Sequence, residues 1–180
     1  MRGLPIHAIW LAQDDPKKNT AVKLSKRGQL KLHKNFNKLP NKGIILEPLC
    51  GKIFGPEDHS ILLNHGGSLV GLDCSWAHIE ESVEAVMKKT RLVPRMLPLL
   101  LAANPVNWGK PSKLTTAEAL AAILYLVGRE EESKRLLSAF HWGEQFLTLN
   151  KEPLDAYKKA KSSSELVDLQ FEFFNIDINK

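Results

Sequence analysis

Short apolar runs separated by turn residues dominate the chain up to about Trp76. Apolar and β-branched runs of this length, bounded by Gly, Pro, Asn and Asp, are typical of buried strands in a parallel sheet. They predict strands at residues 6–11, 43–46, 61–63 and 69–72.

From Ala77 onward the spacing of apolar residues becomes helical. The clearest helix is predicted over residues 116–127, because Thr115 and Glu118 have capping-box spacing and Gly128 marks a stop. Further helices are predicted at residues 77–89, 130–139, 143–149, 153–161 and 165–174. We therefore expect an α/β domain at residues 1–92 and a helical domain at residues 93–180.

Composition narrows the class of protein. A chain of 180 residues that is 43% hydrophobic can bury one substantial core or two small lobes. The net charge of +5 and the pI near 9.2 suit a polyanionic partner. Cys50 and Cys74 lack C-x-x-C spacing, so neither a zinc site nor a disulfide framework is indicated, and no metal is expected.

The apolar segments of the chain do not indicate a membrane protein. Residues 1–12 lack a basic leader and a cleavage pattern, and they predict a strand and not a signal peptide. The most apolar stretch, residues 96–103, is too short to span a bilayer. We expect a soluble cytoplasmic protein without a membrane partner.

The first segment with candidate chemistry is residues 14–20, which follow the first predicted strand and lead into a helix containing Val22 and Leu24. Ligands of parallel α/β sheets bind beyond the carboxyl ends of strands, where loop amides hold anions. The hydroxyl or amide of Thr20 is therefore a candidate for binding a carboxylate. An ordinary N-capping loop with solvated lysines is the alternative, and composition alone favours it.

The second segment, residues 65–76, contains a Gly-Gly turn, a buried strand, and then Asp73 and Trp76 at its exit. No dinucleotide fingerprint or P-loop is present. Asp73 is either a catalytic carboxylate or a cap of the following helix. Trp76 either stacks on a purine or belongs to the core.

The third segment, residues 95–112, is an apolar run that ends in Asn104-Pro105 and Pro111. Proline fixes φ and restricts the residue before it, so a stiff loop that holds its backbone amides in a fixed array is expected. An inter-lobe connector is the alternative. Lys110 and Lys113 add positive charge beside it.

Together and in order, these segments resemble the aminocarboxypropyltransferase family that modifies small-subunit ribosomal RNA. The resemblance rests on D-P-K-K-N-T (15–20), G-L-D-C-S-W (71–76), L-A-A-N-P-V-N-W-G-K-P-S-K-L-T-T-A-E-A (101–119) and F-H-W-G-E-Q-F-L-x-L-N (140–150), and it covers residues 6–157. It implies a SPOUT-like α/β fold: a mainly parallel N-terminal sheet, a helical C-terminal half and a deep trefoil knot. Composition alone does not indicate a knot, because threaded chains are rare.

The same resemblance implies S-adenosylmethionine as cofactor, bound in a cleft around the knot and used as donor of its 3-amino-3-carboxypropyl group. The cofactor-binding residues that it implies are Thr20, Leu72, Trp76, Val93, Leu97, Trp108 and Ser112. Two departures stand out: Asn19 occupies a position where relatives often have cysteine, and Trp108 one where tyrosine is commoner. The second would remove any hydrogen bond that a tyrosine hydroxyl made.

The implied acceptor is N3 of a pseudouridine, often already methylated at N1, in small-subunit ribosomal RNA or a pre-ribosomal particle. Asp73 is the candidate for accepting or steering the imide proton, although an ordinary aspartate, with a pKa of about 3.9, is a weak base. RNA phosphates would be bound by exposed cations, with the last two across the cleft from the others: Lys17, Lys18, Lys23, Lys26, Arg27, Lys110 and Lys113. A monomer is expected.

Two other functions stay open at this stage. One is an RNA methyltransferase that uses the same fold and cofactor but transfers the methyl group. The other is a ribosome-assembly factor that binds RNA without catalysis. A Rossmann methyltransferase is disfavoured because no glycine-rich loop follows the first strand.

Overall fold

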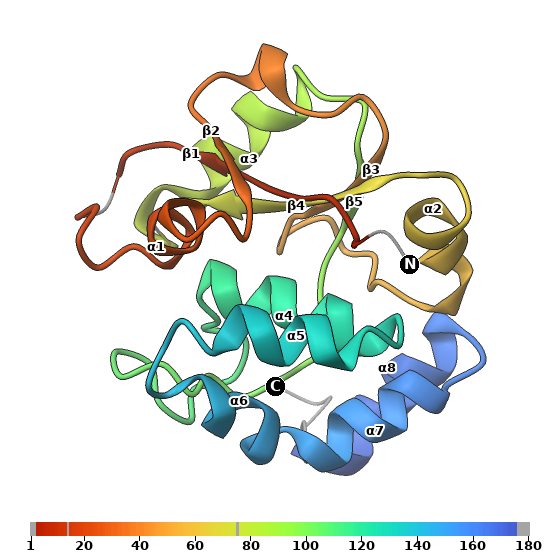
Figure 1. The fold of residues 1–180 in the computed structure, drawn as a ribbon. Helices are drawn as coiled ribbons and strands as arrows, with labels where there is room; N and C mark the ends of the chain where they lie inside the picture. Colours follow the sequence, from red (N-terminus) through yellow and green to blue (C-terminus); the bar gives the residue numbers. More distant parts are fainter. Residues whose placement is uncertain (1–2, 14, 75, 176–180) are drawn as a thin grey trace. The chain divides into compact units, whose positions relative to one another are not determined.

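The computed structural model describes residues 3–13, 15–74 and 76–175 (Figure 1). The chain divides into two compact units. We call Met1–Lys52 with Ser60–Met96 the sheet unit, and Ile53–His59 with Leu97–Lys180 the helical unit. The predicted domain boundary near Val93 stays a prediction.

The sheet unit contains a five-stranded sheet in the order β2-β1-β4-β3-β5. Every pairing between the described strands is parallel. The strands are β1 (Ile6–Trp10), β2 (Lys31–His33), β3 (Gly43–Leu46), β4 (Ser68–Asp73) and β5 (Val93–Arg95). The predictions at 6–11, 43–46 and 69–72 are confirmed as β1, β3 and β4, the three central strands.

The strand predicted at residues 61–63 is wrong, because this segment belongs to helix α2 (His59–Leu63). A short 3-10 helix, Pro56–Asp58, leads directly into α2 and begins with proline, which suits a helix start. Two other helices complete the sheet unit: α1 (Thr20–Lys26) and α3 (Ile79–Met87), the latter preceded by a 3-10 turn at Trp76–His78.

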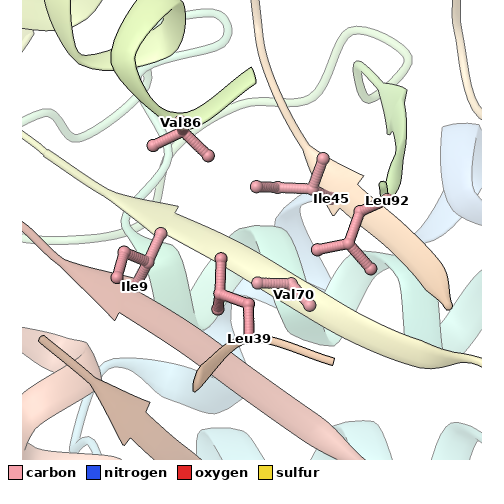
Figure 2. Packing of buried hydrophobic residues seen from close by; sticks show 6 residues of the cluster. All are labelled: Ile9, Leu39, Ile45, Val70, Val86 and Leu92. Atoms are coloured by element: carbon pink, nitrogen blue, oxygen red, sulfur yellow. The ribbon is translucent and has the colours of Figure 1, made fainter. Parts of the chain in front are cut away.

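The core of the sheet unit lies between the central strands and α3. Ile9, Val70 and Ile45 from β1, β4 and β3 pack with Val86 of α3, and Leu39 and Leu92 complete the cluster (Figure 2). Full burial of an aliphatic side chain contributes about 1.5–3 kcal/mol to the free energy of unfolding. These contacts fix which face of β4 points inward, and they thereby fix the position of Asp73 at its end.

The predicted Gly-Gly turn before β4 is present and needs both glycines. Gly66 has a φ of +65°, which favours glycine. A Cβ added at Gly67 would lie 2.3 Å from the backbone oxygen of Ile61. This close approach lets the chain turn from α2 directly into the central strand.

The helical unit contains α4 (Thr116–Leu126), α5 (Glu130–Leu137), α6 (Gly143–Leu149), α7 (Lys151–Lys159) and α8 (Ser163–Phe174). All the helices predicted for this half are confirmed within a few residues. The capping box at Thr115 and Glu118 is present, and α4 is buried over almost its whole length, packing against α5 and α7. Its Ala and Leu side chains permit this close approach of neighbouring helices.

The fold-class prediction is confirmed for the parallel α/β sheet and the helical half, and it is corrected in one respect. The SPOUT-like fold with a deep trefoil knot is not supported; the structure shows a five-stranded parallel sheet and a helical half. The physical reason for the error is that the knot was taken from the resemblance alone, since hydrophobic spacing carries no record of threading. Among the described residues, no helix has the length and apolarity needed to cross a bilayer.

Candidate active site

Asp73 is the last residue of β4 and lies at the carboxyl edge of the sheet, in register with Trp10 at the end of β1. In parallel α/β sheets, this edge is where ligands bind. The Asp73 side chain is only 8% exposed. A buried carboxylate at a strand end needs polar partners, because an unpaired charge is costly in the interior.

Asn19 supplies such a partner. Its Nδ2 donates a hydrogen bond of 2.6 Å to Oδ2 of Asp73, and Asn19 is itself only 8% exposed. Its Oδ1 accepts a hydrogen bond of 2.9 Å from the backbone N–H of Val22, which caps α1. Thr20, the predicted ligand of a carboxylate group, is the first residue of α1 and is therefore held beside Asp73 through Asn19.

The loop before α1 is shaped by Asp15. The backbone oxygen of Asp15 accepts hydrogen bonds from the amides of Lys18 and Asn19, and its Oδ1 accepts one from the amide of Lys17. Both readings of this segment are thus compatible with the structure, because the loop caps a helix and also lies next to a buried carboxylate. Asp14 lies outside the described residues.

The other predicted cofactor residues of the sheet unit lie at different levels. Leu72 is partly buried and packs against the core cluster. Val93 begins β5 and is level with Ile44 and hence with Leu69, four residues before Asp73 along β4. At about 3.3 Å per residue, Val93 is about 13 Å from Asp73 along the strand direction. The Trp76 side chain lies outside the described part of the structure.

In the helical unit, the segment from Leu97 to Ser112 is extended and then doubles back on itself. Leu101 and Pro111 form an antiparallel bridge, and the amide of Ser112 donates to the oxygen of Leu100 at 2.9 Å. Ser112 adopts a φ of +57°, a conformation that non-glycine residues adopt rarely. Such strained backbone is concentrated at functional sites.

Side chains from the helices fix the other edge of this segment. Asn150, fully buried, accepts from the amide of Leu101 at 2.8 Å and donates to its oxygen at 2.9 Å. Tyr157 donates to the oxygen of Leu99 at 3.0 Å, and Gln170 accepts from the amide of Leu99 at 2.6 Å. The predicted stiff array of backbone amides is therefore present, although prolines contribute only part of its stiffness.

Glu118 is the most heavily bonded carboxylate in this region. It is fully buried, and it accepts hydrogen bonds from the amides of Ala103 and Asn104 at 2.7 and 3.0 Å. It also accepts from the Asn104 side chain at 2.9 Å, and from the amide and hydroxyl of Thr115 at 2.7 and 2.8 Å. One side chain thus caps α4 and anchors the loop.

At the tip of this loop, Trp108 is 54% exposed and Val106 is 81% exposed. Leu97 is half-buried, and Ser112 is exposed. Trp108 and Ser112 are thus accessible to a ligand, whereas Leu97 is only partly so.

The predicted RNA-binding cations are all exposed on the surface. Five belong to the sheet unit, where they precede or lie on α1 and its end, and two belong to the loop of the helical unit. They are Lys17, Lys18, Lys23, Lys26 and Arg27, and Lys110 and Lys113.

Several buried or half-buried polar groups were not predicted from the sequence. Glu47 directly follows β3, and Arg95 is the last residue of β5, so both lie at the carboxyl edge of the sheet. Both residues are buried. Burial raises the pKa of Glu47. His7 and His33 stack on neighbouring strands with Nδ1 and Nε2 2.8 Å apart, and burial lowers the pKa of His7 to about 4. Alternation along the strands was the signal that could have placed these histidines side by side.

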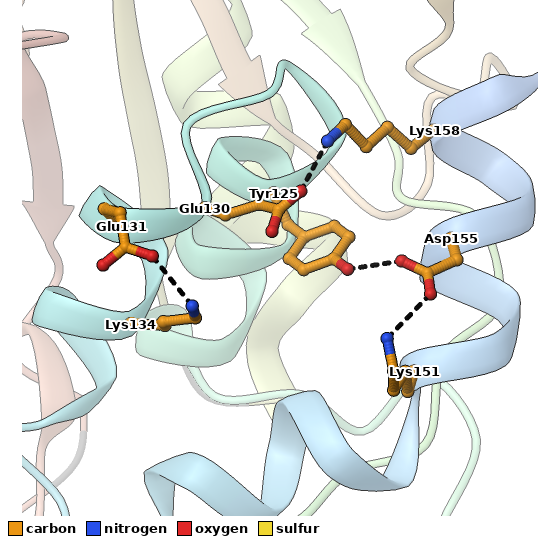
Figure 3. A network of polar contacts seen from close by, with 7 residues as sticks. All are labelled: Tyr125, Glu130, Glu131, Lys134, Lys151, Asp155 and Lys158. Atoms are coloured by element: carbon orange, nitrogen blue, oxygen red, sulfur yellow. Dashed lines mark hydrogen bonds and ion pairs between the residues drawn. The ribbon is translucent and has the colours of Figure 1, made fainter.

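A pocket of about 520 Å³ in the helical unit was also missed. Beside it, the Tyr125 hydroxyl donates to Asp155, which also pairs with Lys151 at 2.9 Å, while Lys158 pairs with Glu130 at 2.5 Å (Figure 3). Burial and the neighbouring carboxylate raise the pKa of Tyr125. These charges neutralise one another, so we assign no chemistry to the pocket. Among the described residues, no group of three or more His, Cys, Asp or Glu is placed to hold a metal ion.

Comparison with known sequences gives consistent matches. The family model described as "Ribosome biogenesis protein, C-terminal" matches residues 44–174. The chain is 41% identical over 169 residues to the 16S rRNA aminocarboxypropyltransferase of Methanosarcina acetivorans, covering 94% of each chain. It is 43% identical over 159 residues to that of Methanothermobacter thermautotrophicus, covering 88% of this chain and 92% of the relative.

A solved structure is also similar, that of the SAM-dependent rRNA:acp-transferase Tsr3 from Vulcanisaeta distributa. The TM-score is 0.85 at 34% identity, over 97% of this chain and 90% of that one. This match supports the α/β fold with its five-stranded parallel sheet, and it does not support the SPOUT-like trefoil knot.

Proposed function

Because the chain belongs to the family of 16S rRNA aminocarboxypropyltransferases, we propose that it transfers the 3-amino-3-carboxypropyl group of S-adenosylmethionine to small-subunit ribosomal RNA during ribosome biogenesis. The observation that carries the proposal is similarity over nearly the whole chain, at 41% identity and 94% coverage. Similarity of this extent includes both units and every segment singled out above.

The residues fit a cofactor of this kind. S-adenosylmethionine, when bound, supplies an electrophilic methylene next to a sulfonium. The sheet unit offers Asp73, a buried carboxylate at the ligand-binding edge, and Thr20 beside it. The helical unit offers a loop whose backbone is held rigidly and whose tip exposes Trp108. Rigid positioning matters here, because misplacement of reacting groups by about 1 Å costs on the order of 100-fold in rate.

We assign the residue roles as follows. Thr20 binds the carboxylate of the methionine part through its hydroxyl or amide. Trp108 and Ser112, on the loop of the helical unit, also bind the cofactor. The remaining contacts are apolar, and they come from Leu72, Trp76, Val93 and Leu97. Val93 is the weakest of these assignments, since it is level with Leu69 and not with Asp73.

We place the acceptor atom at N3 of a pseudouridine, with or without a methyl group at N1. This imide carries a proton that must leave when N3 is alkylated. Asp73 accepts or steers that proton, and its burial at the sheet edge supports the assignment. A buried base also excludes water, which would otherwise compete with the RNA for the donor.

The exposed cations hold the RNA through its phosphates. Contacts of this kind give an affinity that depends on salt but little choice of sequence. The target is selected instead by loop shape and by an accessible base, within ribosomal RNA or a pre-ribosomal particle. A cytoplasmic location, a monomeric state, the absence of a membrane partner and a boundary between domains near Val93 belong to the same proposal.

Labelled cofactor tests the reaction. The protein is incubated with small-subunit RNA that contains the pseudouridine but lacks the aminocarboxypropyl group, and with S-adenosylmethionine labelled either at the carboxyl carbon or at the methyl carbon. We expect carboxyl label to enter the RNA and methyl label to remain in the soluble product. Methyl label alone in the RNA would establish a methyltransferase, and no label from either position would indicate a binding factor without catalysis.

A further inference from the structure

Asn19 connects two features of the sheet unit that lie 54 residues apart in the sequence. Its Oδ1 accepts from the amide of Val22 at 2.9 Å, and its Nδ2 donates to Oδ2 of Asp73 at 2.6 Å. The two partners demand different atoms, since the Val22 amide can only donate and a carboxylate can only accept. The side-chain amide of Asn19 therefore satisfies both in a single orientation.

The capping role alone does not require asparagine. Ser, Thr and Asp cap helices about as well, because each supplies the acceptor oxygen. Unlike these three residues, asparagine also carries an N–H donor, on the same side-chain amide as its acceptor oxygen. The feature that selects asparagine here is thus the carboxylate of Asp73 and not the helix.

The environment strengthens the second contact. Asn19 and Asp73 are each 8% exposed, so water does not compete freely for the carboxylate. A hydrogen bond to a charged group is stronger than one between neutral groups, and its loss in a buried place costs more. The carboxylate is therefore held in one rotamer by a donor that α1 and the Asp15 loop fix in turn.

We infer that Asn19 is the positioning residue of Asp73: its amide sets the direction in which the Asp73 carboxylate faces the base that is alkylated. The inference rests on the proposed function of Asp73. Asn19 itself contacts neither substrate nor cofactor in this scheme. It acts by restricting Asp73 to the rotamer in which the imide proton of the RNA base is within reach.

Two substitutions separate capping from positioning. Asn19→Ser keeps the acceptor for the Val22 amide but is too short to reach Asp73 as asparagine does. Asn19→Asp keeps the cap and replaces the donor with a second carboxylate. We expect single-turnover transfer to fall about 10-fold in Asn19→Ser and about 100-fold in Asn19→Asp. The affinity for the cofactor, measured by calorimetry, should change less than the rate does. Any change in affinity should have the same direction as the change that Asp73→Ser causes.

Asn35→Ser is the matched control. Asn35 also caps a short helix of the sheet unit, accepting from the amide of Asn37 at 2.9 Å, and it is exposed. The same substitution there should leave the rate unchanged. If Asn35→Ser slowed transfer as much as Asn19→Ser does, loss of an asparagine cap would explain both and the inference would be overturned.

A double-mutant cycle gives the decisive readout. In an Asp73→Ala background, or in Asp73→Ser if the former does not fold, Asn19→Ser should change the rate less than about twofold. Full additivity of the two substitutions would overturn the inference. If the wild type transfers no group at all, the proposed function fails. A crystal structure of Asn19→Ser then decides the positioning role, since an unchanged Asp73 rotamer would refute it and an altered one would support it.

Discussion

The sheet unit and the helical unit hold their site residues in different ways. In the sheet unit, the backbone ladder positions the end of β4, and the side chain of Asn19 orients Asp73. In the helical unit, the loop from Leu97 to Ser112 has little ladder of its own and depends on side chains of the surrounding helices, most of them buried. We therefore expect the loss of one side chain to lower the free energy of unfolding less at a strand end than in a loop whose backbone is bonded to side chains.

Glu118 provides the largest expected effect. Glu118→Ala leaves the buried amides of Ala103 and Asn104, and the partly buried amide of Thr115, without their acceptor. Each unsatisfied buried group costs about 1–3 kcal/mol, so we expect the free energy of unfolding to fall by about 4 kcal/mol. Urea unfolding measures it.

Glu165→Ala is the control for Glu118. Glu165 occupies the equivalent position after the cap Ser162 of α8, but it is exposed and accepts from the amide of Lys161. We expect a loss of about 1 kcal/mol or less. Equal losses in the two variants would show that Glu118 acts as a helix cap and not as an anchor of the loop.

Asn150→Leu has the next largest expected effect on stability. The substitution keeps the side-chain volume but removes both partners of the Leu101 backbone. We expect a loss of about 2–3 kcal/mol in unfolding free energy and weaker binding of S-adenosylmethionine. Calorimetry and thermal unfolding check the two effects. A destabilised variant with unaltered cofactor affinity would contradict the assigned role of the loop.

The pair of His7 and His33 gives the sheet unit a dependence on pH. Burial lowers the pKa of His7 to about 4 in the folded protein, whereas an unfolded histidine titrates near 6.5. The unfolded state therefore binds more protons between these values, and stability is lost as the pH falls from about 6.5 toward 4. Because His7 is only half-buried, we expect about 1–2 kcal/mol.

Unfolding of His7→Gln from pH 7 to pH 4 tests this expectation. The variant should lose less stability over this range than the wild type does. Parallel pH profiles of the two proteins would show that acid sensitivity comes from other groups.

The smallest expected effects are on the affinity for RNA and its dependence on salt. Lys17→Ala with Lys18→Ala in the sheet unit is compared with Lys110→Ala with Lys113→Ala in the helical unit. Each lysine that contacts a phosphate should lower the slope of log affinity against log salt concentration by about 1. Filter binding across a salt series measures it. An unchanged slope in either pair would remove that unit from the RNA-binding surface.

The sequence predicted the elements that are central and missed those at the edges. β1, β3 and β4 were found because each is a buried apolar run. β2 and β5 were missed because they are edge strands of three residues, one within a cationic stretch and the other containing Pro94. Edge strands are exposed on one side and accept proline, so neither carries the apolar signal of a buried strand.

The candidate site shows the same limit in another form. Asp73 and Thr20 could be predicted, because each follows or begins an element with a recognisable pattern. The contact of Asn19 with Asp73 could not, since it joins residues 54 positions apart through the register of the sheet. The capping box likewise predicted the bond of Glu118 to Thr115, but not its bonds to Ala103 and Asn104.

The central claim is that the 3-amino-3-carboxypropyl group of the cofactor, and not its methyl group, is transferred to the RNA. Mass spectrometry of nucleosides from small-subunit RNA, isolated from cells with and without the protein, tests it most directly. The account predicts one nucleoside that carries an aminocarboxypropyl group only when the protein is present, and that loses it in Asp73→Ala cells. An identical set of modified nucleosides in both strains, or a difference of a methyl group alone, would contradict it.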